Sequence, residues 1–307
     1  MVIQVSSLNV FPIKSCAGTA VNSATATDHG FTFDRTWLIV DEQNNFLTQR
    51  ELPRMALIKP RIFSRRTGNN LLDTDETATW KAPAQIACAS PDFDLAIANH
   101  PYQQFVMSLE APDMEPYSAP FNPYGDRLDV VVWGDTCQAI DEGDEAALWL
   151  SRFLEKRCRL VRFADNSLRK VDPAYAVNEN NTVNFADGYP FLLISEASLA
   201  DLNSRLDNEV PMNRFRPNIV VSGCDAFAED TWKKIRIDSV EFNFVKPCSR
   251  CVITTNDQST GAFTDQPLRM LSTFRLQNKK IIFGQNIIAS GPGSIRLGTK
   301  LEILEYN

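Results

Sequence analysis

The chain has 307 residues, of which 44% are hydrophobic and 22% charged, as in ordinary soluble globular proteins. Its formal net charge of −7 argues against a broad basic surface for nucleic acid. The length suits two domains, although one large β domain would also fit. No uncharged apolar run approaches the ~18 residues of a membrane span, and the N-terminus lacks the pattern of a signal peptide.

Cysteine usage indicates the redox compartment. Seven cysteines are scattered along the chain, at positions 16, 88, 137, 158, 224, 248 and 251. An odd number in a chain of this length argues against a secreted disulfide framework and for an environment that keeps thiols reduced. We therefore expect a cytoplasmic protein.

The first half of the chain predicts short strands separated by turns. Residues 2–13 are rich in Val, Ile and Phe and predict a strand. Residues 33–40 predict a second strand, and residues 46–50 predict the return strand of a hairpin. Residues 107–127 are rich in Pro, Glu, Asp and Asn, so we expect a surface loop there.

Two helices are expected in the second half. Residues 144–157 open with acidic and close with basic side chains, as the helix dipole favours. Residues 195–206 form the second helix, with Ser195 as its N-cap. The polar residues 165–184 predict a linker or a mobile loop. Further strands are expected at 191–194, 218–222, 234–244, 251–255, 280–289 and 300–304.

This order of elements predicts the fold class. Strands outnumber helices, and strict alternation of strand and helix is absent, so a doubly wound α/β sheet is disfavoured. The pattern predicts a mainly β fold with added helices, an α+β protein built on barrels or a sandwich.

The most informative motif is Lys-Pro-Cys-Ser-Arg-Cys-Val-Ile-Thr-Thr at 246–255. Cys248 and Cys251 could be half of a zinc site, but the only histidines for a second half are His29 and His100. A redox dithiol would place the second cysteine at a helix start, whereas the β-branched run that follows favours a strand. Buried structural cysteines are the third reading.

Several cations lie near expected strand ends. Arg214 and Arg216 would point to the same side of an extended segment, and Lys14 and Arg35 each lie where a loop meets a strand. Such charges are usually solvated, but together they would suit a phosphate, which arginine binds in bidentate fashion. The sequence contains no Ser-His-Asp pattern or phosphate-binding glycine loop that would indicate another chemistry.

A family resemblance connects these features. The motifs that carry it occur together and in order, at residues 11–16, 33–37, 185–191, 196–202, 215–223, 246–255 and 283–286. The chain resembles MOSC-domain proteins with an N-terminal β-barrel region, in particular the mitochondrial amidoxime-reducing component and the bacterial N-hydroxylaminopurine-resistance molybdoenzymes. The resemblance covers essentially the whole chain. It implies a MOSC N-terminal region at 1–165, of which residues 1–35 could pack into the C-terminal barrel, and a MOSC domain at 166–307.

The resemblance also implies a molybdenum–molybdopterin cofactor, with Cys251 as the protein ligand of the metal. Cys251 and Asp187 are the implied catalytic residues, since a carboxylate such as Asp187 could supply protons. The relatives carry small hydroxyl residues in the 187–189 loop and a tyrosine at the position of Asn286. The implied contacts to the cofactor are Lys14, Ser15, Arg35, Asp187, Gly188, Tyr189, Arg216, Ser249, Arg250, Cys251 and Asn286.

The activity implied by the family is reduction of N-hydroxylated compounds: hydroxylamines, amidoximes and N-hydroxylated bases. No later cysteine cluster for an iron–sulfur centre follows the last expected strand, so we expect electrons from a separate ferredoxin or flavodoxin-type reductase system. We expect a monomer without stable nucleic-acid or membrane binding. A molybdopterin carrier or a sulfur-transfer module with a cysteine persulfide is the alternative, and a β-rich interaction protein is a third possibility.

Overall fold

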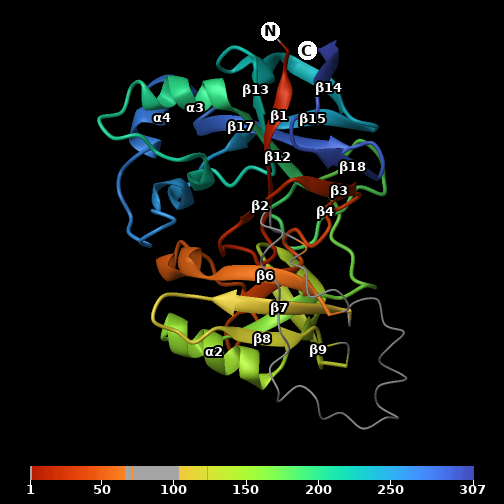
Figure 1. Cartoon of the computed structure of the whole chain (residues 1–307), viewed down its shortest axis with the longest axis vertical. Helices are drawn as coiled ribbons and strands as arrows, with labels where there is room; N and C mark the ends of the chain where they lie inside the picture. Colours follow the sequence, from red (N-terminus) through yellow and green to blue (C-terminus); the bar gives the residue numbers. More distant parts are fainter. Residues whose placement is uncertain (1, 66–70, 72–103, 123) are drawn as a thin grey trace.

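The computed structural model describes residues 2–65, 71, 104–122 and 124–307, so Cys88 and His100 lie outside the described residues. The protein is mainly β with a few helices, which confirms the expected fold class. Figure 1 shows two halves along the longest axis, with both chain termini at the outer end of the upper half.

The upper half is built on a nine-stranded sheet. Its strands, in spatial order, are β19 (Leu301–Tyr306), β14 (Trp232–Ile237), β15 (Val240–Ser249), β17 (Lys280–Ala289), β12 (Phe191–Ser195), β13 (Ile219–Ser222), β1 (Gln4–Val10) and β2 (Thr19–Val21), with β16 (Leu276–Gln277) paired to β17 beside this path. Neighbouring strands run antiparallel except β12 and β13. That pair is connected through α3 (Glu196–Asn203), as a parallel pair needs a crossover.

The N-terminal strands belong to this upper half. β1 pairs with β13, and a smaller sheet contains β18 (Gly293–Arg296), β3 (Ser23–Thr27) and β4 (Gly30–Phe31). The chain therefore starts among strands from its C-terminal part and only then enters the lower half. The boundary near residue 165 stays a prediction.

In the described residues, the lower half contains two small sheets and the helix α2 (Asp144–Leu154). The first sheet has the order β5 (Trp37–Val40), β11 (Arg159–Phe163), β10 (Asp135–Asp141) and β9 (Arg127–Val132). The second has the order β6 (Lys59–Ser64), β7 (Phe105–Glu110) and β8 (Tyr117–Pro120). Helix α2 buries Leu150 and Phe153 on one face and carries Asp144 and Glu145 in its first turn.

Both expected helices are confirmed. Ser195 caps α3, because its hydroxyl accepts a hydrogen bond from the Ser198 backbone N–H at 3.1 Å. A further helix, α4 (Leu268–Phe274), was not predicted. Four short 3-10 turns complete the described elements: η1 (Pro53–Leu57), η3 (Met212–Arg214), η4 (Ala228–Thr231) and η5 (Val252–Thr255).

Two expected strands are wrong. Residues 252–255 form η5, because the hydroxyls of Thr254 and Thr255 donate to the Cys251 and Val252 carbonyls and compete with strand pairing. The return strand at 46–50 is reduced to a single bridge between Val40 and Phe46.

Two polar segments are also more ordered than expected. The loop predicted at 107–127 contains parts of β7 and β9 and all of β8, because Val106, Met107 and Leu109 are buried in the core. Residues 165–184 form neither helix nor strand, but the buried Arg169 guanidinium donates to the carbonyls of Asn184 and Ala186, at 2.7 Å each. This segment is therefore pinned to the protein and is not a solvated linker.

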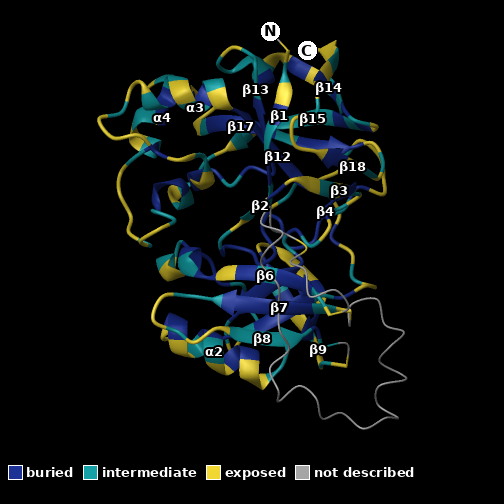
Figure 2. Cartoon of the chain, in the orientation of Figure 1, coloured by how far each residue is buried: buried dark blue, intermediate teal, exposed yellow. Residues whose placement is uncertain are grey.

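The two halves share one apolar core. A single cluster of buried side chains includes Leu8 and Phe242 from the upper half, and Ile62 and Leu150 from the lower half. Figure 2 shows the strands at the centre of each half as mostly buried, with exposed residues on turns and outer helix faces. Because the core is continuous, loops from both halves are held on either side of the junction between them.

Candidate active site

A cavity of about 440 Å³ brings together every cofactor-contact residue that the family resemblance implied. Loops and strand ends of both halves line it. The nominated residues on its wall are Lys14, Ser15, Arg35, Asp187, Gly188, Tyr189, Arg216, Ser249, Arg250, Cys251 and Asn286. Only the folded structure brings these residues together, since they come from segments spread over more than 270 positions of the chain.

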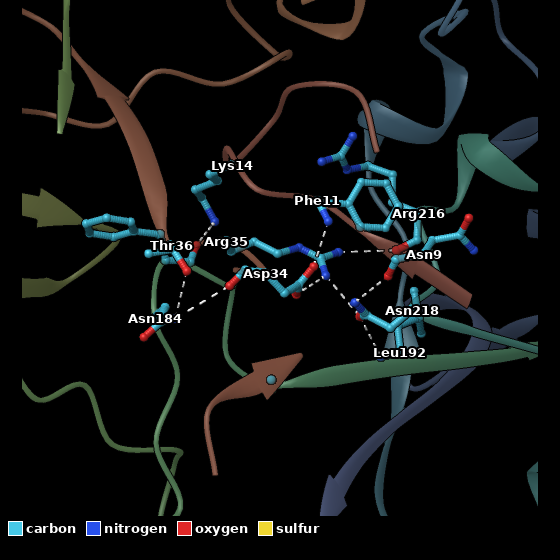
Figure 3. A network of polar contacts seen from close by, with 12 residues as sticks. Asn9, Phe11, Lys14, Asp34, Arg35, Thr36, Asn184, Leu192, Arg216 and Asn218 are labelled. Carbon is cyan, nitrogen blue, oxygen red and sulfur yellow. Dashed lines mark hydrogen bonds and ion pairs between the residues drawn. The ribbon is translucent and has the colours of Figure 1, made fainter. Parts of the chain in front are cut away.

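One wall of the cavity is an arginine network, drawn in Figure 3. Arg35 donates from Nη1 to Asn218 Oδ1 at 2.9 Å and from Nη2 to the Arg216 carbonyl at 3.2 Å. It also pairs with the buried Asp34, whose Oδ1 accepts from the Phe11 backbone N–H at 2.8 Å. The guanidinium carbons of Arg35 and Arg216 lie 4.4 and 4.3 Å from the Phe11 ring centroid.

This network brings two like charges close together. Burial, and then repulsion from Arg35, lowers the pKa of Arg216 well below its ordinary value of 12.5. Both arginines have a left-handed backbone, with φ of 45° for Arg35 and 56° for Arg216. Non-glycine residues adopt this conformation at an energetic cost, and such residues are concentrated at functional sites.

Lys14 and Asp187 form an ion pair on a second wall. The Lys14 ammonium is buried and also donates to the Phe185 carbonyl at 2.8 Å. Burial lowers the pKa of Lys14, against the opposing charge of Asp187. The Asp187 side chain is 64% exposed, so desolvation raises its pKa little, and Lys14, Arg50 and Trp133 hold that pKa well below its usual range. Asp187 is therefore a carboxylate at neutral pH, and its lowered pKa makes it a weak proton acceptor while the pair with Lys14 is intact.

The cysteine motif lies where β15 ends. Each thiol has an arginine beside it: Arg250 Nη1 lies 2.9 Å from Cys248 Sγ, and Arg50 Nη2 lies 3.2 Å from Cys251 Sγ. Arg250 is fixed by its hydrogen bond to the Phe215 carbonyl at 2.7 Å, while its Nε is buried without a protein partner. Both sulfurs of the motif therefore lie within hydrogen-bond distance of a guanidinium group.

Comparison with known proteins agrees with the family resemblance over nearly the whole chain. The MOSC domain model matches residues 180–302, and the MOSC N-terminal beta barrel domain model matches residues 2–92 and 86–157. Mitochondrial amidoxime-reducing component 1 of Mus musculus is 35% identical over 98% of this chain and 82% of its own length. The chain belongs to the MOSC-domain family. Mitochondrial amidoxime reducing component 2 of Rattus norvegicus (34%) and component 1 of Homo sapiens (32%) match this MOSC protein over 96% and 98% of its length, and over 81% and 82% of theirs.

The charge of the cavity fits the phosphorylated pterin implied for this MOSC protein. Its wall carries a single carboxylate, Asp187, among seven cations in the described part of the chain. The cations are Lys14, Arg35, Arg50, Arg216, Lys246, Arg250 and Lys280. Two of them, Arg35 and Lys14, have a carboxylate partner, so a net positive charge remains for an anion. An anionic group would also relieve the repulsion between Arg35 and Arg216.

The donor set for a metal is small. Among the residues that the structure describes, no three His, Cys, Asp or Glu side chains gather as a metal cluster. Cys251 is half-buried on the cavity wall, where its sulfur can reach a soft metal carried by another ligand. The residues therefore fit a metal held by its own organic cofactor and one protein thiolate.

The loop at 187–189 and Asn286 complete the wall. A side chain at Gly188 would meet open space, so this glycine leaves room in the cavity. Asn286 lies on β17 opposite Leu192, and Tyr189 lies near Lys246. No described helix of the MOSC protein is long and apolar enough to span a membrane.

Sequence reasoning missed Arg50 and Trp133, both on the cavity wall. The only signal for Trp133 was a large aromatic residue in a Trp-Gly turn, and Arg50 gave none. Arg214, in contrast, does not line the cavity. It belongs to η3, which is not extended, so its side chain turns away from Arg216 and pairs with Asp257 at 2.8 Å.

A second cavity of about 820 Å³ lies beside the first and shares Arg216 with it. Its wall includes α3 and the segment around η1. Its charges are balanced, with Lys59 and Arg216 against Glu196 and Glu209. None of the other nominated residues lines this larger cavity.

Proposed function

We propose that this protein is an oxidoreductase that reduces N-hydroxylated small molecules with a molybdenum–molybdopterin cofactor bound in the 440 Å³ cavity. The observation that carries the proposal is the convergence of the nominated residues around one half-buried thiol in a cavity with excess positive charge. The relatives are named for the same activity, the reduction of amidoximes.

In this proposal, the residues of the chain bind and orient the cofactor. Lys14, Arg35 and Arg216 hold its phosphate, because charge-assisted hydrogen bonds from buried cations are strong and directional. Cys251 supplies one thiolate to the metal, with Arg50 beside the sulfur. Ser15, Ser249, Tyr189 and Asn286 supply polar contacts around the pterin. The bound cofactor would supply two-electron redox chemistry that protein side chains lack.

The reaction consumes two electrons and two protons for each N–O bond cleaved, and releases the reduced nitrogen compound and water. Lys14 holds Asp187 as a carboxylate, so Asp187 would carry a proton into the cavity only after the pair opens and its pKa rises toward the ordinary value. This keeps the proton path on the side of the cavity where Lys14 and Asp187 meet.

We further propose that the electrons come from a separate redox protein and that the protein works in the cytoplasm as a monomer. The six cysteines in the described segments are all free, which suits a reducing compartment. With a chemical reductant, the purified holoprotein should turn over an amidoxime, whereas NADH alone should not support turnover. Adding a ferredoxin or flavodoxin-type reductase system should restore NADH-dependent activity, with a rate that falls as salt rises.

The decisive experiment combines metal and pterin analysis of the purified protein with an assay of amidoxime reduction by reduced viologen. Stoichiometric molybdenum and pterin with turnover support the reductase. Cofactor without turnover supports the alternative of a cofactor carrier, and a persulfide on Cys251 detected by mass spectrometry supports sulfur transfer. Absence of both cofactor and turnover in protein made with ample molybdate would contradict the proposal.

A further inference from the structure

Trp133 lies on a part of the cavity wall that the cofactor assignment does not use, and Arg50 connects it to the part that the assignment does use. Both come from the lower half of the molecule. Trp133 sits on the two-residue turn between β9 and β10, and Arg50 follows the segment that bridges to β5. The Trp133 side chain is 47% exposed, although it lines the cavity. A large aromatic surface is therefore open to solvent beside the site of the proposed chemistry.

Trp133 is held in place from three directions. The Arg50 guanidinium carbon lies 4.8 Å from its ring centroid, and the Phe46 ring packs at 5.0 Å in a tilted arrangement. Its indole N–H donates to Asp187 Oδ1 at 3.2 Å. An exposed ring with this many fixed contacts is pre-oriented, which reduces the entropy lost when a ligand packs on it.

The backbone at this turn is unfavourable for tryptophan. Trp133 has φ of 58°, in the left-handed region that favours glycine, while the neighbouring Gly134 lies outside that region. A turn with glycine at position 133 would avoid the strain. This strained turn places the indole over the cavity.

Arg50 connects this ring to the proposed metal ligand. The same guanidinium that packs on Trp133 lies 3.2 Å from Cys251 Sγ. The indole and the sulfur are thus separated by a single guanidinium group. A small molecule bound beside Cys251 would therefore lie within reach of the Trp133 ring.

We propose that Trp133 is the substrate-recognition residue of this protein and that it selects flat, conjugated N-hydroxylated compounds over saturated ones. The inference rests on the proposed reductase function and names the substrate class. Its physical basis is stacking of a planar substrate group on the exposed indole. Arg50 is a positioning residue that keeps the ring aligned with the Cys251 side of the cavity.

The test uses two substrates with the same reacting group. Benzamidoxime carries an aromatic ring, whereas acetamidoxime carries a methyl group in its place. In the holoenzyme, Trp133→Leu should raise KM for benzamidoxime by about 3- to 10-fold, the range expected for loss of one aromatic pair. Its KM for acetamidoxime should change less, because a methyl group cannot stack on the indole. Trp133→Phe, which keeps a ring, should restore most of the difference.

Leu148→Ala is the matched control, since Leu148 is a 73% exposed apolar residue on α2, outside the cavity. It should change neither substrate. An equal change for both substrates in Trp133→Leu, or no change for either, would overturn the inference. Cofactor content and circular dichroism establish that the variants are folded and loaded.

A second readout separates this inference from the proposed function. Isothermal titration of benzamidoxime into wild type and Trp133→Leu measures binding without turnover. If the wild type reduces neither amidoxime, the reductase proposal fails, and weaker binding to Trp133→Leu still supports the aromatic recognition site. Equal binding to both proteins, or none to the wild type, rejects the site itself.

Discussion

The two neighbouring cavities differ in size and in charge, and these two properties favour different cavities as the cofactor site. The larger, of about 820 Å³, has balanced charges and contains one nominated residue, Arg216. The smaller, of about 440 Å³, carries seven cations and one carboxylate among the described residues and contains every cofactor contact that the family resemblance implied. Volume alone would select the larger cavity, which contains one implied cofactor contact. Uncompensated charge on buried or half-buried side chains is the better guide, because it is costly unless a ligand of opposite charge balances it.

The largest expected effect distinguishes the two thiols inside the smaller cavity. Cys251→Ser should abolish amidoxime reduction with a chemical reductant, whereas Cys248→Ala should keep most of it, because a single thiolate serves the metal. Steady-state assays of the two purified variants, with circular dichroism as a check on folding, measure the difference. Equal losses in the two variants would contradict the assignment of Cys251.

The next prediction compares one lysine from each cavity. Lys14→Ala should weaken cofactor binding by about 10- to 100-fold, since a hydrogen bond to a charged group contributes about 1.5–3 kcal/mol. Lys59→Ala, on the wall of the larger cavity, should leave the cofactor content unchanged. Molybdenum and pterin occupancy of the purified variants is the measurement.

Arg216→Ala should lower occupancy in the same way as Lys14→Ala, although Arg216 borders both cavities. Full occupancy in both Lys14→Ala and Arg216→Ala would make these residues ordinary structural charges. The cradle for a phosphate would then have to be sought elsewhere.

A smaller effect is expected for inorganic phosphate on cofactor-free protein. Phosphate should raise the melting temperature at neutral pH more than chloride at equal ionic strength, because it relieves the repulsion between Arg35 and Arg216. A ligand at 100 times its dissociation constant adds about 2.7 kcal/mol, and each kcal/mol corresponds to about 2–4 °C in a protein of this size. Differential scanning fluorimetry measures the shift. Arg216→Ala should lose most of it, and a shift of the same size in that variant would place the phosphate elsewhere.

The smallest effect concerns the single carboxylate of the charged cavity. Asp187→Asn removes the anion that competes for Lys14, so phosphate should bind about 2- to 5-fold more tightly, as expected for about 1 kcal/mol of Coulomb energy at short range in water. Glu209→Gln, its counterpart in the larger cavity, should not change phosphate affinity. Titrations of the two cofactor-free variants give both constants, and weaker binding to Asp187→Asn would mean that Asp187 itself orients the ligand site.

The sequence by itself determined the class of fold and nominated eleven residues on the wall of the 440 Å³ cavity, although not Arg50 or Trp133. Periodicity located α2 and α3, and apolar runs located most strands, because burial imposes a repeating pattern on local sequence. Prediction from the sequence failed at 252–255. There, threonine hydroxyls donate hydrogen bonds to nearby carbonyls, and the segment forms η5 instead of the expected strand. It also failed at 107–127, where polar turn residues masked the buried positions of β7.

Only the tertiary structure decided which charges share a cavity. Arg214 and Arg216 are two positions apart, yet the η3 turn sends Arg214 to Asp257 and leaves Arg216 beside Arg35. Arg50 and Trp133 meet across 83 positions of sequence at Cys251 and Asp187. No local pattern encodes such a meeting, because it depends on how the two halves pack around their common core. Packing between distant segments fixes where a side chain lies, whereas the sequence by itself gives its chemical type.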